Sequence, residues 1–152
     1  TAFFAHMEEI DLCWRMQLSG NKVYYCGQSV VYHVGGGTLA KNNPRKTYLN
    51  FRNNLLMIYK NAGSRRSTIL LKRRFFDLLA ALKFLITNGK KDAIAVLQAH
   101  RDFRKMRSLY PISSSENSTK TRPLTIYDRS ILWDYYLCNR KKFSSLPKKI
   151  NS

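Results

Sequence analysis

The sequence predicts an α/β fold that continues into a mainly α-helical tail. Two short runs of β-branched and aromatic residues, at 22–26 and 29–34, have the composition of strands. An amphipathic helical pattern precedes them, and several more follow. We therefore expect a helix, two short strands and a second helix in residues 1–62, and helices alone after that.

The first helix is expected to run from Glu8 to about Ser19. Acidic residues occupy its first turn, where the positive end of the helix dipole stabilises them, and Gly20 stands where a capping glycine is common. Arg15 lies four residues after Asp11, so the two are expected to pair on one face of this helix.

The second helix, over about 48–59, is followed by a predicted helical hairpin at 63–110 with its turn at 88–89. The first hairpin helix, 68–87, carries an apolar stripe at steps of three and four that predicts core packing: Leu71, Phe75, Leu78, Leu79, Leu82, Leu85 and Ile86. The second hairpin helix, 91–106, is expected to turn another set inward: Ala93, Val96, Leu97, His100 and Phe103.

After the hairpin, residues 111–125 are polar and of low complexity, which predicts a linker. Residues 126–152 then combine a dense apolar run with lysines. We expect a short docking helix there, followed by a basic tail.

Charge is the unusual feature of the composition. Lys and Arg number 27 against 9 Asp and Glu, and the resulting net charge of +18 favours anionic partners. No RNA-binding signature, helix-turn-helix or basic heptad region is present, so nucleic acid is an unexpected partner. Three widely spaced cysteines without a CxxC pair predict neither disulfides nor zinc, and no apolar run is long enough to cross a membrane. These features predict a cytoplasmic protein.

Several short motifs between residues 3 and 61 occur in a definite order. They are Phe3-Phe4, Glu8-Glu9-Ile10-Asp11-Leu12 with Arg15, Gly20, the strand run ending at His33-Val34, Gly35-Gly36-Gly37, and Asn50-Phe51-Arg52-Asn53-Asn54-Leu55. In this order and spacing the chain resembles glycosyltransferase family 2, whose members share a GT-A fold. The resemblance implies the C-terminal portion of a GT-A nucleotide-sugar transferase domain.

The resemblance implies that the acidic pair holds the catalytic base. In the family, the second acidic residue of the pair takes the proton of the acceptor hydroxyl as that oxygen attacks the sugar, and this position is Glu9 here. The usual Asp is replaced by a Glu that is one methylene longer, so Glu8 could share or take the role. Considered without the resemblance, acidic residues in a first helical turn are more often dipole partners on a solvated face.

The resemblance also implies a site for the donor diphosphate. His33, Gly35 and Gly36 would contact the diphosphate or its metal, and Arg52 would neutralise charge on the leaving nucleotide. Considered alone, a strand-terminal His more often hydrogen-bonds a neighbouring backbone group. A divalent metal, Mg or Mn, is expected to be bound mainly outside this chain, because the Asp-x-Asp motif that holds it is absent.

Opposite its apolar stripe, the helix at 68–87 mixes aromatic residues with cations, a combination that suits a lipid headgroup boundary. The residues expected to meet a membrane surface are Lys72, Arg73, Phe76, Lys83 and Phe84. The hairpin would hold the protein on the anionic inner face of the cell membrane, where lipid-linked acceptors reside.

The expected reaction is transfer of a sugar, with inversion, from a nucleotide-diphosphate sugar to the hydroxyl of a glycan or lipid-linked acceptor. It would serve surface polysaccharide or glycolipid synthesis. The start at Thr1, directly before an apolar stretch, looks like a cut, so a nucleotide-binding half is expected upstream and this chain alone is expected to be inactive. The alternative is a non-catalytic basic module that binds anionic membrane or nucleic acid.

Overall fold

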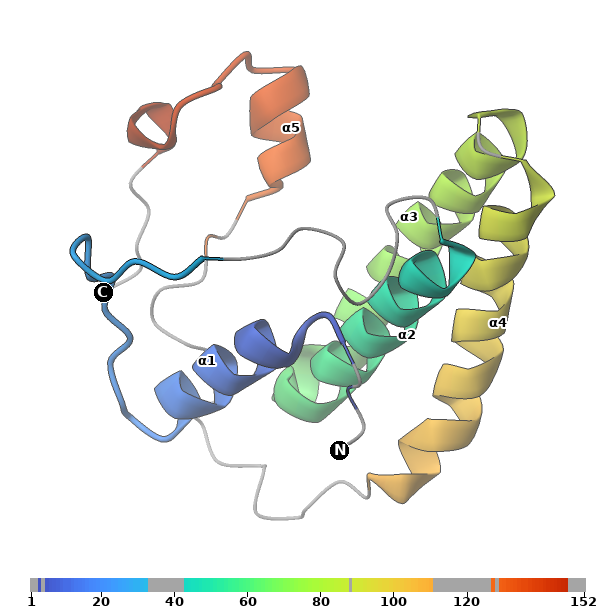
Figure 1. The fold of residues 1–152 in the computed structure, drawn as a ribbon, viewed down its shortest axis with the longest axis horizontal. Coiled ribbons are helices and arrows are strands. Elements are labelled where there is room, and N and C mark those ends of the chain that lie inside the picture. The colour runs from blue at the N-terminus through green and yellow to red at the C-terminus, as the bar shows by residue number, and fades with distance from the viewer. Residues whose placement is uncertain are drawn as a thin grey trace. The chain divides into compact units, whose positions relative to one another are not determined.

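The computed structural model describes residues 3, 5–32, 43–87, 89–110, 127 and 129–147 of the chain. Five α-helices are described: α1 (Glu8–Leu18), α2 (Pro44–Asn61), α3 (Arg66–Thr87), α4 (Lys90–Met106) and α5 (Ile131–Tyr136) (Figure 1). Single 3-10 turns lie at Gly63–Arg65, Arg107–Leu109 and Phe143–Ser145. The chain divides into two compact units, Thr1–Thr121 and Arg122–Ser152.

The expected α/β fold is wrong, because the part of the chain that is described contains helices and no strand. Within 22–32 a turn does form, where the amide of Ser29 donates to the carbonyl of Cys26 at 3.1 Å. The side chains around this turn lie in solvent, and Tyr32 is 95% exposed. Strand-forming residues need a neighbouring strand and a packing surface, and a lone hairpin is marginal in water.

The end of α1 confirms the role expected of Gly20. The amide of Gly20 donates to the carbonyl of Gln17 at 3.0 Å, and the amide of Asn21 donates to that of Met16 at 2.9 Å. These two hydrogen bonds end the helix, as is common where the residue after a helix has a left-handed backbone. Gly20 has a φ of 84°, which a residue without a Cβ adopts at little cost.

Helices α2, α3 and α4 lie side by side and form the core of the first unit (Figure 1). Leu55 and Leu56 of α2 are fully buried and pack with Phe103 of α4. The ring of Tyr59 meets Phe103 edge-on, with centroids 5.9 Å apart. Small buried residues of α4 allow close approach of the helices: Ala93, Ala95 and Ala99.

The hairpin of α3 and α4 confirms the predicted pair of helices and its turn, where Gly89 has a φ of 84°. On α4, the predicted inward residues Val96 and Phe103 are buried, but Leu97 is 62% exposed. Its expected place in the core is therefore wrong.

Helix α3 packs against the bundle with the face opposite to the one predicted. All seven residues of the predicted core stripe are exposed, from 46% at Leu79 to 87% at Ile86. The buried residues of α3 are Asp77 and Ala81. The ring of Phe84 meets Phe51 of α2 edge-on, with centroids 6.2 Å apart.

Polar partners give the physical reason for this orientation. Asp77 is 1% exposed, and a buried carboxylate is costly unless charges and hydrogen bonds surround it. Arg73 lies 2.7 Å from one of its oxygens and His100 of α4 lies 3.0 Å from the other. The guanidinium of Arg73 also stacks over the ring of Phe51 at 5.3 Å. These contacts exist only when the face of Asp77 points at α2 and α4.

The second unit contains the expected short helix, α5. Its buried residue is Asp134, which accepts hydrogen bonds from the Tyr127 hydroxyl and the Arg140 guanidinium, both at 2.7 Å. The hydrogen bond from Tyr127, with those from Arg140 and Arg129, holds the pKa of Asp134 below its usual value despite desolvation. The apolar side chains of α5 remain exposed, Trp133 at 58%.

The orientation of α3 can be tested by two neighbouring substitutions. Asp77→Ala leaves Arg73 and His100 without their acceptor and is expected to lower the free energy of unfolding by about 3 kcal/mol. Leu78→Ala changes an exposed side chain and is expected to cost no more than about 0.5 kcal/mol. Urea unfolding followed by circular dichroism measures both, and a larger loss for Leu78→Ala would contradict the orientation described.

Candidate active site

The acidic pair opens helix α1. Glu8 and Glu9 are its first two residues, and both side chains are exposed. Successive helix residues point about 100° apart, so the two carboxylates do not face each other. Met7, at the cap position, makes no side-chain hydrogen bond to the helix. The start of α1 therefore presents two separate, accessible carboxylates.

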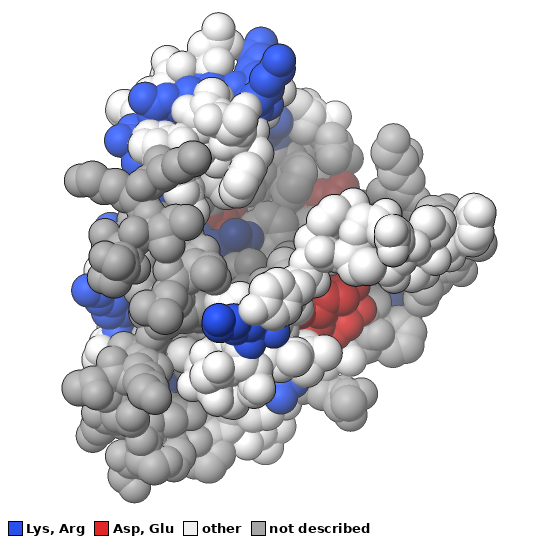
Figure 2. All heavy atoms as spheres, turned by 90° about the vertical axis from the view of Figure 1, so that its left-hand side faces the viewer, with Lys and Arg blue, Asp and Glu red and all other residues white. Residues whose placement is uncertain are grey.

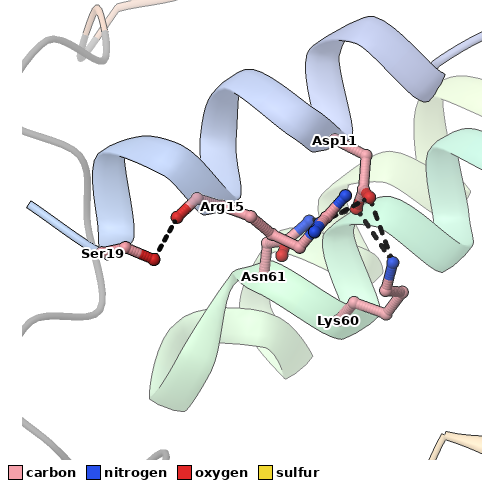
Figure 3. A network of polar contacts seen from close by, with 5 residues as sticks. All are labelled: Asp11, Arg15, Ser19, Lys60 and Asn61. Atoms are coloured by element: carbon pink, nitrogen blue, oxygen red, sulfur yellow. Dashed lines mark hydrogen bonds and ion pairs between the residues drawn. The ribbon is translucent and has the colours of Figure 1, made fainter. Parts of the chain in front are cut away.

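Asp11, the third acidic residue of this turn, has a different environment. It is 2% exposed and lies where α1 meets the end of α2. Its oxygens accept from Arg15 at 2.9 Å, from Lys60 at 3.1 Å and from Asn61 at 2.7 Å (Figure 3). The pair with Arg15 confirms the prediction, whereas Lys60 and Asn61 could not be identified from helical spacing. Asp11 ties α1 to α2.

Burial of Asp11 raises its pKa and is the largest single influence on it. The hydrogen bonds from Asn61, Lys60 and Arg15, with the charge of Lys60, together outweigh this burial. The pKa of Asp11 therefore lies below its usual value of 3.8, and the side chain is ionised at neutral pH.

The backbone just before the acidic pair is held in an uncommon conformation. His6 and Met7 have φ values of 70° and 72°, in the left-handed region that costs a residue with a Cβ about 1 kcal/mol or more. The fully buried side chain of Asn53 donates from its amide nitrogen to the carbonyl of Ala5 at 2.7 Å and to that of His6 at 3.0 Å. These two bonds fix the direction in which α1 starts.

Arg52 acts on this contact from the neighbouring position of α2. Its guanidinium donates to the carbonyl oxygen of the Asn53 side chain through Nε at 3.0 Å and Nη2 at 2.8 Å. It also stacks over the ring of Tyr48 at 5.3 Å. In the structure Arg52 orients Asn53. The sequence did not suggest this positioning role; it suggested only a contact with the diphosphate.

A groove between α2 and α4 was not predicted from the sequence. It has a volume of about 350 Å³ and carries more positive than negative charge. Its lining residues are Pro44, Arg45, Tyr48, Lys91, Ala95, Gln98, Arg101 and Asp102. Burial opposes the ionisation of Asp102, but hydrogen bonds from Tyr48 and Arg101 lower its pKa. Lys91, Ala95, Gln98 and Asp102 recur at steps of three and four along α4, which places them on one face of that helix.

The remaining predicted site residues fall into two groups. His33, Gly35 and Gly36 lie outside the described residues. On α3, three of the residues expected at a membrane are exposed and two, Arg73 and Phe84, point toward α2. The exposed three are Lys72, Phe76 and Lys83.

The excess of cations is visible on the surface. On the face drawn in Figure 2, Lys and Arg atoms occupy several separate areas and acidic atoms occupy few. No group of three or more His, Cys, Asp and Glu side chains able to hold a metal ion occurs in the described ranges. The divalent metal is expected mainly outside this chain, and His33, its predicted contact, lies outside the described residues.

No protein-family model, curated protein or solved structure matches this chain.

The low pKa of Asp11 predicts a dependence of stability on pH. A carboxylate with a lowered folded-state pKa stabilises the fold above its unfolded pKa, and this contribution is lost as the pH falls from about 4 through the folded pKa. Asp11→Asn should therefore lower the free energy of unfolding by about 1–2 kcal/mol at about pH 7. The difference from the wild type should shrink by about pH 2.5. Melting followed by circular dichroism at both pH values measures it. A difference that stays constant would refute the contribution of the charge.

The hydrogen bonds of Asn53 to the backbone of Ala5 and His6 predict that two adjacent, chemically identical substitutions have unequal effects. Asn53→Ala removes two hydrogen bonds to a strained backbone and is expected to lower the free energy of unfolding by about 2 kcal/mol. Asn54→Ala removes one weak contact, from the side-chain nitrogen to the sulfur of Met7 at 3.7 Å, and should cost less than half as much. Urea unfolding compares the two variants. Equal losses of unfolding free energy would contradict the role assigned to the hydrogen bonds of Asn53.

Proposed function

We propose that this chain provides the acceptor-activating part of an inverting glycosyltransferase that uses a nucleotide-diphosphate sugar. The observation that carries the proposal is the contact of Asn53 with the backbone of Ala5 and His6. It joins the segment just before the acidic pair to the Arg-Asn pair of α2. Both motifs belong to the resemblance to glycosyltransferase family 2. The left-handed backbone at His6 and Met7 supports the same assignment, because strained backbone conformations cluster at functional sites.

In the proposed reaction, the carboxylate of Glu9 accepts the proton of an acceptor hydroxyl as its oxygen attacks the anomeric carbon of the donor sugar. The bond from that carbon to the diphosphate breaks, and its electron pair leaves with the nucleoside diphosphate. The exposed position of Glu9 allows the hydroxyl of a large glycan or lipid-linked acceptor to reach it. Glu8 is the alternative base.

The proposal leaves the donor to other parts of the protein. The divalent metal is expected to be bound mainly outside this chain, so no step is assigned to it here. His33, Gly35 and Gly36 stay predicted contacts of the diphosphate. We place the reaction at the cytoplasmic face of the cell membrane, in the synthesis of a surface polysaccharide or glycolipid, which the net charge of +18 supports.

The test measures release of nucleoside diphosphate by the intact protein, with a panel of nucleotide sugars and with glycan and lipid-linked acceptors. Loss of a general base costs about 10²–10⁴-fold in rate, so Glu9→Gln is expected to lower kcat at least about 100-fold while the Kd of the donor stays unchanged. Glu8→Gln is the matched control, one residue away and equally exposed, and should retain most activity.

The outcomes separate the alternatives. A large loss in Glu8→Gln alone assigns the base to Glu8. Unchanged turnover in both variants refutes the assignment of the acidic pair. Absence of turnover with every donor and acceptor would favour the non-catalytic basic module instead.

A further inference from the structure

The outer side of α3 is an apolar surface that no described residue of the bundle covers. We call it the outward face and define it by seven residues: Leu71, Phe75, Leu78, Leu79, Leu82, Leu85 and Ile86. Each is between 46% and 87% exposed. Single exposed leucines are ordinary, but seven large apolar side chains in line on one helix mark an interaction surface.

The outward face is not a misplaced core. The other side of α3 is already occupied, since Asp77 is paired with Arg73 and with His100 of α4. Rotating α3 to bury the outward face would expose Phe84 and remove these pairs. The structure of the bundle thus leaves the apolar stripe available to something else.

The exposed charges that α3 itself places beside the outward face are all positive. Lys72 and Lys83 flank it on one side and Arg74 on the other, and all three are exposed. The single acidic residue of α3, Asp77, is buried on the opposite side. The helix therefore presents an apolar stripe bordered by cations and by no exposed carboxylate of its own.

This combination selects among possible occupants. A nucleic acid would satisfy the cations but would leave seven apolar side chains in water. A second copy of α3 would cover the stripe but would bring its own lysines against those of the first. The surface of an anionic bilayer satisfies both, because acyl chains accept the stripe while Lys and Arg extend to the headgroup phosphates.

We infer that the outward face of α3 binds the surface of an anionic lipid bilayer, with the helix lying in the plane of the interface. At 22 residues α3 is about 33 Å long, and the cations on both sides of the stripe suit this in-plane position. No described helix combines the length and the apolar character needed to cross a bilayer. The apolar residues of this face are those that the sequence assigned to the core, whereas Lys72 and Lys83 were expected at the membrane from the sequence.

Co-sedimentation of the protein with vesicles tests the inference. We expect binding to vesicles of phosphatidylcholine with about 30% phosphatidylglycerol, and much weaker binding to phosphatidylcholine alone. Leu78→Ser with Leu82→Ser should weaken binding at least about tenfold, because two central apolar contacts are lost. Both side chains are at least half exposed, so the fold should be retained, as circular dichroism can verify.

Two further variants locate the surface. Ile131→Ser with Leu132→Ser alters two equally apolar and exposed residues of α5 and should leave vesicle binding unchanged. Lys72→Gln with Lys83→Gln should weaken binding on the order of fivefold per cation removed, an effect that added salt reproduces in the wild type.

Three results would overturn the inference. The first is equal binding to neutral and anionic vesicles, and the second is a loss of binding in the α5 variant with none in the Leu78 and Leu82 variant. The third is a dimer in sedimentation velocity that the Leu78 and Leu82 variant dissociates, in a protein that does not bind vesicles. That result would assign the outward face to a second copy of the chain.

Discussion

The buried amide of Asn53 connects the segment before α1 to the helical bundle, and the rest of the candidate site depends on it. Its nitrogen donates to the carbonyl groups of Ala5 and His6, and its oxygen accepts from Arg52. The nitrogen and the oxygen of the buried amide are therefore both hydrogen-bonded. Water cannot replace these bonds in a fully buried position. The left-handed backbone at His6 and Met7, and hence the direction of α1, follows from this constraint.

The same principle recurs at the other helix contacts. Asp11 joins α1 to α2 through Lys60 and Asn61, and Asp77 joins α3 to α4 through His100. In each case a short acidic side chain is buried only because donors from another helix surround it. Apolar contacts around Leu55, Leu56 and Phe103 give the bundle its core, but the polar contacts specify which faces meet.

This division has a consequence for function. Because Asp11 is occupied in holding α1, the acidic segment separates into one structural residue and the two exposed residues Glu8 and Glu9. Because Asp77 turns one side of α3 inward, the apolar stripe on the other side remains free for a membrane. The proposed chemistry and the proposed docking surface therefore lie on residues that the fold itself does not use.

The sequence by itself determined the helices of the first unit, the capping role of Gly20, the hairpin turn and the pair of Asp11 with Arg15. These depend on spacing of three to five residues along one chain, which a sequence records directly. Strands could not be inferred in the same way, since the runs at 22–32 form none without a partner. Only the tertiary structure decided which side of α3 is inward, and that Asn53 holds the start of α1. Those outcomes depend on contacts such as Asp77 with His100, between residues far apart in the chain, and apolar periodicity shows that a helix has a face without showing what covers it.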